Sequence, residues 1–204
     1  MIESEVVIPT KYGSLPAFTA CPSEAGPYPA VILFMDAPGI RDELRNMARR
    51  IAKHGYYCLL PDLYYRLGTL RFDVPRRNEA MSVLIRGAMS SLTNAAAFYP
   101  HRIKAAASLY GVGIITDKED SPHLFLDRIQ GELYYAFAET DRSVPPHIPG
   151  ELKGLLEKQD VKHELKVFPG TEHGFAFPER AIYNTLAAEE TWDKMFAMWD
   201  RTLK

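Results

Sequence analysis

The hydrophobic and polar positions of the chain follow two alternating patterns. A nearly continuous apolar run at 30–35 predicts a parallel strand covered on both faces, and shorter strand-like runs follow at 56–60, 104–110, 133–139 and 163–168. Between the strands, apolar residues at helical spacing predict helices over 41–54, more weakly over 78–89, and over 151–158. The last segment, from about residue 178, predicts a helix in which Trp192, Phe196 and Trp199 form a stripe of core packing.

This alternation of strands and helices predicts an α/β fold with a mostly parallel sheet and helices on both faces. Two apolar runs at 6–8 and 15–20, separated by a turn at 11–14, predict an antiparallel hairpin at the sheet edge. The length of 204 residues and the 47% hydrophobic content suit one domain over 1–204.

Two polar turns carry the candidate chemistry. Asp141 follows the apolar run at 133–139, and His173 follows the run at 163–168, flanked by Gly170 and Gly174. In α/β enzymes, an acid and a histidine just past the carboxyl ends of neighbouring parallel strands form the base half of a nucleophilic triad. An Asp in such a turn is often just a turn or cap residue, and a histidine near glycines is often only part of a turn.

Composition narrows the function classes. The formal net charge of -2 gives no global field for nucleic acid, and no apolar run is long enough for a membrane span. The acidic N-terminus resembles no secretory signal, and two cysteines without a CxxC motif suit a reducing cytoplasm. The remaining histidines share no metal-ligand spacing, so we expect no metal and no cofactor; they are His54, His101, His123, His147 and His163.

Five stretches together carry a resemblance to a known family. They are VILFMDAPGIR, LLPDLYYRLG, RIKAAASLYG, SPHLFLDRIQGELYYAFAETDRSVPP and FPGTEHGFAFPER, in this order along nearly the whole chain. The sequence resembles the dienelactone hydrolase family of the α/β-hydrolase superfamily. The resemblance implies an ester- or lactone-hydrolysing scaffold that acts on a small molecule through a Cys or Ser nucleophile, a His and an Asp.

The resemblance also assigns positions within this sequence. Asp141 matches the triad acid and His173 the triad base. Asp36 matches an acidic residue near the family's nucleophile, although it could instead cap a helix, and the backbone N–H of Ala37 matches an oxyanion-hole donor. Arg66 resembles an arginine that binds a substrate carboxylate, and it could also simply pair with Asp62.

The nucleophile of the family has no counterpart. The family places it in a G-x-C-x-G-G or G-x-S-x-G turn, and this chain contains neither pattern. At 88–100 the sequence passes from a segment that resembles one family helix to a segment that resembles the end of a later one. A unit of roughly 30–40 residues with a helix, the central strand and the nucleophile turn is expected between them. The deletion could be natural or an artefact of the gene sequence.

Five residues are candidates for a substitute nucleophile. Cys58 lies in an apolar strand and reads as a small hydrophobe, and Cys21 lies in an edge strand. Ser108 is nearer the end of a strand but lacks the glycine-flanked turn that exposes a nucleophilic oxygen, and Ser90 and Ser91 suit helix capping. The sequence therefore predicts a hydrolase scaffold that is inactive or very weak, and it leaves open whether the chain is an enzyme. The alternatives are a weak esterase with a stand-in nucleophile or water, and a non-catalytic protein that binds a small carboxylate.

Overall fold

The computed structural model describes residues 1–24, 26–36, 38–65 and 97–204. The chain divides into two compact units, Met1–Ala88 and Met89–Lys204. Within the described residues, the first unit contains a four-stranded sheet and the second a three-stranded sheet. The single domain over 1–204 remains a prediction. The predicted helix over 78–89 lies outside the described residues.

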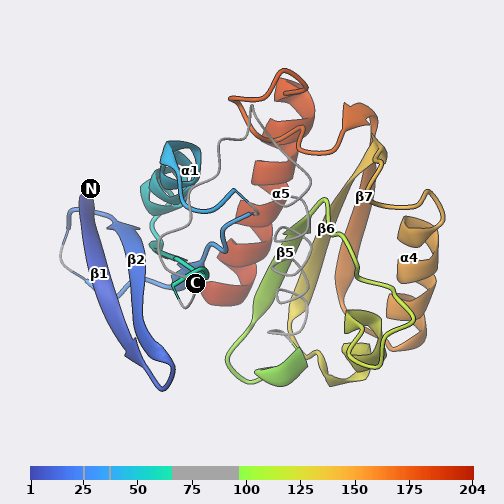
Figure 1. Cartoon of the computed structure of the whole chain (residues 1–204), viewed down its shortest axis with the longest axis horizontal. Helices are drawn as coiled ribbons and strands as arrows, with labels where there is room; N and C mark the ends of the chain where they lie inside the picture. Colours follow the sequence, from blue (N-terminus) through green and yellow to red (C-terminus); the bar gives the residue numbers. More distant parts are fainter. Residues whose placement is uncertain (25, 37, 66–96) are drawn as a thin grey trace. The chain divides into compact units, whose positions relative to one another are not determined.

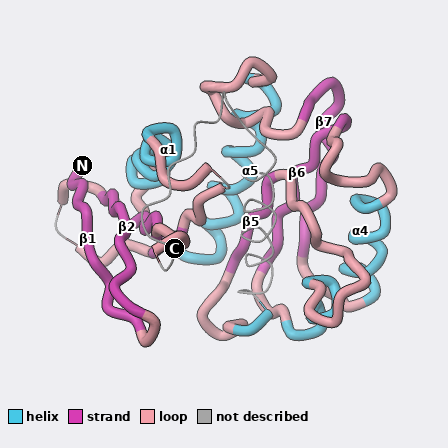
Figure 2. The backbone as a smooth tube through the Cα atoms, in the orientation of Figure 1, coloured by secondary structure: helices cyan, strands magenta, loops and turns pink. Residues whose placement is uncertain are grey.

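The first unit is built on a sheet of strand order β1-β2-β4-β3. β1 (Ile2–Thr10) and β2 (Gly13–Cys21) form the predicted antiparallel hairpin (Figure 2), and β2 pairs antiparallel with β4 (Tyr57–Pro61). β4 in turn pairs parallel with β3 (Ala30–Ile32). Helix α1 (Asp42–Lys53) matches the predicted helix and buries the apolar stripe Leu44, Met47, Ala48, Ile51 and Ala52.

One strand of this unit differs from its prediction. The apolar run at 30–35 predicts a strand buried on both faces, but β3 ends at Ile32, whose exposed fraction is 46%. A hydrogen bond from Leu33 N–H to Leu59 O at 2.9 Å lies directly after β3. Among the described residues β3 has β4 as its one neighbouring strand, and a strand at a sheet edge is covered less completely than a central one.

The second unit is an all-parallel sheet of order β5-β6-β7 (Figure 1). Its strands are β5 (Ala105–Leu109), β6 (Glu132–Thr140) and β7 (His163–Glu172). The central strand β6 is buried from Glu132 to Ala138, as expected for a strand with neighbours on both sides and helices on both faces. The parallel α/β architecture predicted from the alternation of strands and helices is therefore present in this unit.

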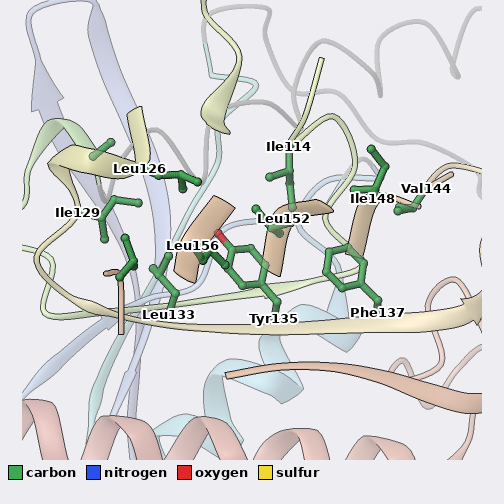
Figure 3. Close-up of a cluster of buried hydrophobic side chains, with 12 residues drawn as sticks. Ile114, Leu126, Ile129, Leu133, Tyr135, Phe137, Val144, Ile148, Leu152 and Leu156 are labelled. Atoms are coloured by element: carbon green, nitrogen blue, oxygen red, sulfur yellow. The ribbon is translucent and has the colours of Figure 1, made fainter. Parts of the chain in front are cut away.

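The hydrophobic core of the second unit lies between the sheet and helix α4 (Ile148–Lys158) (Figure 3). Tyr135 and Phe137 point from β6 toward this helix, and the rest of the cluster comprises Ala97, Ile114, Leu126, Ile129, Leu133, Val144, Ile148, Leu152, Leu156 and Val161. The 3-10 helix η2 (Pro122–Arg128) contributes Leu126.

Helix α5 (Thr185–Leu203) covers the opposite face of the same sheet (Figure 3). Trp192, Phe196 and Trp199 are all buried in it, with neighbouring ring centroids 5.5 and 5.6 Å apart, so the aromatic stripe is core packing as predicted. The helix begins later than the expected residue 178 because its N-cap is Asn184, whose side-chain oxygen accepts the Ala187 N–H.

Candidate active site

The two parallel strands β6 and β7 place Asp141 and His173 at the same edge of the sheet. The last register pair of the two strands joins Thr140 to Glu172. Asp141 directly follows Thr140, and His173 directly follows Glu172. Since the carboxyl ends of neighbouring parallel strands lie side by side, side chains just beyond them can meet.

A bulge in β7 produces this alignment. Ala138 pairs with Phe168 and Thr140 with Glu172, so β7 has two more residues than β6 between these pairs. Glu139 stabilises the extra residues by accepting the Gly170 N–H at 2.8 Å, and Gly170 has a φ of +66° that suits glycine. The bulge therefore sets which β7 residue lies opposite Asp141.

The side chains of Asp141 and His173 are joined directly. The distance from His173 Nδ1 to Asp141 Oδ2 is 2.7 Å, and Asp141 Oδ1 accepts the Ser143 N–H at 2.8 Å. The Asp141 side chain is 3% exposed and the His173 side chain 33% exposed. Because an ionised carboxylate only accepts hydrogen bonds, Nδ1 carries the proton of the neutral ring and Nε2 is its basic nitrogen.

A tight turn presents the imidazole. Phe175 N–H donates to Glu172 O at 3.0 Å, which closes a turn with His173 and Gly174 at its two central positions. Gly174 has a φ of +95°, and a Cβ there would lie 2.5 Å from Arg180 Nη1. Position 174 therefore favours glycine because of its backbone conformation.

Asp36 has a different environment in the first unit. The Arg41 guanidinium binds both of its carboxylate oxygens and also binds Glu43, whose side chain is 4% exposed. Arg41, not Asp36, is the N-cap of α1. The capping role considered for Asp36 is therefore not the one that its side chain has here.

The other candidate positions divide into two groups. Ala37, Arg66, Ser90 and Ser91 lie outside the described residues. Cys58 is fully buried, and burial raises the pKa of its thiol to about 12, while Cys21 is half-buried at the end of β2. Ser108 is half-buried near the end of β5. The burial of Cys58 agrees with its interpretation as a small hydrophobe.

Two contacts of the site have no counterpart in the sequence analysis. Tyr110 lies directly after β5, and its ring centroid is 5.3 Å from that of His173. Ser143 supplies a backbone N–H to Asp141. A backbone donor leaves no signal in residue type, and nothing near Tyr110 in the sequence points to a residue 63 positions away.

The described parts of the chain contain neither a metal-holding group of side chains nor a membrane-spanning helix. Across 1–65 and 97–204, apart from residues 25 and 37, no group of three or more His, Cys, Asp or Glu side chains is arranged to hold a metal ion. The helices of these same parts are too short or too polar to cross a membrane.

Comparison with known proteins decides the family. The sequence profile described as "Dienelactone hydrolase family" matches residues 15–96 and 86–203. This chain belongs to the dienelactone hydrolase family. The match confirms the resemblance carried by the five stretches. The second matched segment, 86–203, includes β6, β7 and the turns with Asp141 and His173.

Relatives of this dienelactone hydrolase family member span nearly all of it. A Synechocystis protein provisionally named carboxymethylenebutenolidase is 26% identical over 237 positions, with 98% of this chain and 96% of the relative covered. A protein of the same provisional name from Escherichia coli K12 is 25% identical, with 92% of this chain and 83% of the relative covered. One from Methylorubrum extorquens is 40% identical over 68 residues, which cover 33% of this chain and 23% of the relative.

Solved structures show the same fold. A provisionally named dienelactone hydrolase from Klebsiella pneumoniae superposes with a TM-score of 0.83 at 24% identity, covering 98% of each chain. A dienelactone hydrolase-like promiscuous phosphotriesterase from metagenomic libraries superposes with a TM-score of 0.75 at 16% identity, covering 100% and 99%. The chain therefore has the α/β-hydrolase-like fold of its family.

Proposed function

We propose that this chain is a scaffold for ester or lactone hydrolysis in which His173 is the general base and Asp141 the acid that orients it. The hydrogen bond of 2.7 Å between His173 Nδ1 and Asp141 Oδ2 carries this proposal. It fixes the imidazole tautomer, so Nε2 is the nitrogen that accepts a proton from an attacking oxygen or sulfur.

The environments of the two side chains suit these roles. Asp141 is buried and accepts a backbone N–H, so its charge is held in place and stabilises the imidazolium that forms when Nε2 takes a proton. The ring of His173 is one-third exposed, which leaves room for a small ester or lactone to approach.

We further propose that the chain lacks the unit that carries the family's nucleophile. The profile of the family matches in two segments, 15–96 and 86–203, which meet where the sequence departs from the family pattern. The Synechocystis match extends over 237 positions against 204 residues in this chain, so at least 33 positions of that match have no residue here. Both observations support a deletion of one strand–turn–helix unit.

The expected activity is therefore hydrolysis by water alone. Water activated by His173 replaces an acyl-enzyme pathway, and the loss of a triad nucleophile lowers the rate by several orders of magnitude. A positioned general base still contributes about 10²- to 10⁴-fold in favourable cases. We expect slow turnover that depends on His173 and shows no burst of one product per chain.

Hydrolysis of p-nitrophenyl acetate by purified protein tests this function. We expect His173→Ala to lower the protein-dependent rate by about 10-fold or more, because the imidazole supplies the only proposed general base. Asp141→Asn should lower it by a similar factor, because the amide can donate to Nδ1 and reverse the tautomer. His147→Ala is the matched control, since His147 is 68% exposed in the same unit and any exposed imidazole reacts slowly with this ester.

Two results would contradict the proposal in different ways. If His173→Ala hydrolyses the ester as fast as the unchanged protein, His173 is not the general base and the proposed role is wrong. If the unchanged protein releases a burst of one p-nitrophenolate per chain, a stand-in nucleophile exists, and water is not the attacking group.

A further inference from the structure

Tyr110 has an unusual backbone conformation for an aromatic residue. Its φ is +56°, in the left-handed region, and its N–H donates to Ala136 O at 2.8 Å, which extends the pairing of β5 with β6 by one residue. A left-handed conformation is strained for a residue with a side chain, and such strain persists where surrounding contacts hold it. The contacts of the Tyr110 side chain therefore account for this backbone conformation.

The Tyr110 hydroxyl binds the loop that carries His173. The phenol oxygen accepts the Ala176 N–H at 2.5 Å, and both residues are buried, with exposed fractions of 3% and 2%. Ala176 follows directly after the turn closed by the bond from Phe175 N–H to Glu172 O. The hydroxyl thus fixes the backbone at the exit of the turn that presents the imidazole.

The Tyr110 ring contacts the imidazole itself. The two ring centroids are 5.3 Å apart with planes tilted by 49°, and Phe175 meets the Tyr110 ring edge-on at 5.0 Å. Asp141 fixes the imidazole through Nδ1 from the end of β6, while Tyr110 limits its tilt from the end of β5. Three consecutive strands of one sheet therefore contribute to the orientation of His173.

Gly111, directly after Tyr110, is closely surrounded by side chains. A Cβ at Gly111 would lie 2.4 Å from Ile114 Cδ1 and 2.6 Å from Ser108 Oγ, so the chain folds tightly behind the tyrosine. The left-handed conformation turns the ring toward the β7 loop, and an ordinary strand conformation would continue β5 instead. The strain at Tyr110 is the cost of placing its ring and hydroxyl against the His173 loop.

We propose that Tyr110 is a positioning residue for His173, and that it holds the imidazole in the orientation that its bond to Asp141 requires. This proposal rests on the role proposed for His173 as a base. Tyr110 acts through the Ala176 backbone and the ring contact, and it takes no part in proton transfer.

Replacement of the hydroxyl separates positioning from packing. Tyr110→Phe keeps the ring but leaves the buried Ala176 N–H without its acceptor. Nuclear magnetic resonance of ¹⁵N-labelled protein should then show Ala176 amide exchange faster by about 10-fold or more. It should also show a weakened and broadened Nδ1–H signal of His173, with a larger share of the other tautomer in the imidazole ¹⁵N shifts.

Tyr135→Phe is the matched control. Tyr135 lies on β6 in the same unit, is 2% exposed, and no described residue hydrogen-bonds its hydroxyl, which points into the cluster beside α4 (Figure 3). The same chemical change there should leave the Ala176 exchange rate and the His173 signals as in the unchanged protein. Should Tyr110→Phe fail to fold, Tyr110→Asn replaces it, because asparagine tolerates the left-handed region while lacking the phenol.

The proposal is overturned if the folded Tyr110 variant keeps the Nδ1–H signal and tautomer of the unchanged protein, because Tyr110 then only fills space. The readout needs no turnover, so it separates two failures. If the Tyr110 variant loses the His173 signals while the unchanged protein does not hydrolyse the ester, the positioning role is supported and the proposed hydrolysis is contradicted. Unchanged signals together with His173-dependent hydrolysis would do the reverse.

Discussion

At the scale of single residues, the candidate chemistry depends on what surrounds each reactive group. His173 combines a buried carboxylate partner with a ring that remains one-third exposed. Cys58 carries a sulfur atom, which is a stronger nucleophile than a hydroxyl oxygen, but it lies fully buried on β4. Burial disfavours the thiolate, which is the reactive form of cysteine. The position of Cys58 therefore makes its thiol unreactive.

Thiol labelling tests this contrast. Because burial raises the Cys58 pKa to about 12, its thiol stays protonated at pH 8. We expect native protein treated with iodoacetamide at pH 8 to gain a single carbamidomethyl group, at Cys21, and protein unfolded in guanidinium to gain two. Intact mass and peptide mapping give the count and the position. Native labelling of Cys58 as fast as Cys21 would contradict its burial and would restore it as a candidate nucleophile.

The residue scale also shows what a sequence can and cannot reveal about this site. Asp141 and His173 were predictable because each directly follows a strand-like apolar run, and parallel strands align such positions. Tyr110 was not, because its role depends on a left-handed φ and on a bond to Ala176, 66 residues further along the chain. Neither property is encoded in local periodicity.

At the scale of elements, the hydrophobic periodicity predicted which helices and strands exist better than it predicted where they begin and end. Helix α1 follows its apolar stripe closely, and β5 and β6 lie where their runs predict. α4 begins at Ile148, before the predicted residue 151, because Pro149 is favourable in a first helical turn. β7 continues through Pro169 and Gly170 to Glu172, since its bulge absorbs residues that read as a turn.

One charged contact holds helix α5 to the start of β6. Glu132 is 6% exposed and binds the Arg201 guanidinium, and its Oε2 lies 2.8 Å from Lys162 Nζ. The hydrogen bond from Arg201 lowers the pKa of the Glu132 carboxyl below its ordinary 4.5, against the opposing effect of burial. A lowered folded pKa stabilises the protein above the unfolded value, and this stabilisation is lost as pH falls through the folded value.

Glu132→Gln should therefore destabilise the protein in a pH-dependent way. We expect a loss of about 1 kcal/mol in the free energy of unfolding near pH 7, because the partners of Glu132 are partly exposed to solvent. The difference should shrink below pH 4.5, where the carboxyl in the unfolded chain is protonated. Urea unfolding of both proteins between pH 3 and pH 7 measures it. A difference that stays constant over this range would show that the ionised carboxylate is not the stabilising form.

At the scale of the whole molecule, the two sheets share one property. Among the described residues, β3 ends one sheet with β4 as its one partner, and β5 ends the other with β6 as its one partner. Both are parallel strands, and parallel strands seldom occur at uncovered positions. The exposed Ile32 and the half-buried residues of β5 are what a missing neighbour would produce. This pattern agrees with the deletion proposed from the sequence comparisons.

Restoring the missing unit is the decisive test of that proposal. The segment of the Synechocystis relative that has no counterpart here, inserted between Asn94 and Ala95, should supply a strand, a nucleophile turn and a helix. If His173 and Asp141 are competent partners, p-nitrophenyl acetate hydrolysis should rise by about 10³-fold or more and begin with a burst of one product per chain.

The control for this insertion is the same segment with its nucleophile changed to alanine, which restores the strand but not the chemistry. It should gain stability toward urea without gaining the burst, because β5 would acquire a second neighbouring strand while no acyl-enzyme could form. A folded insertion protein as inactive as this control would mean that the His173–Asp141 pair has lost its competence for another reason. The activity of the chain would then be limited by its base, and the deletion would not explain it.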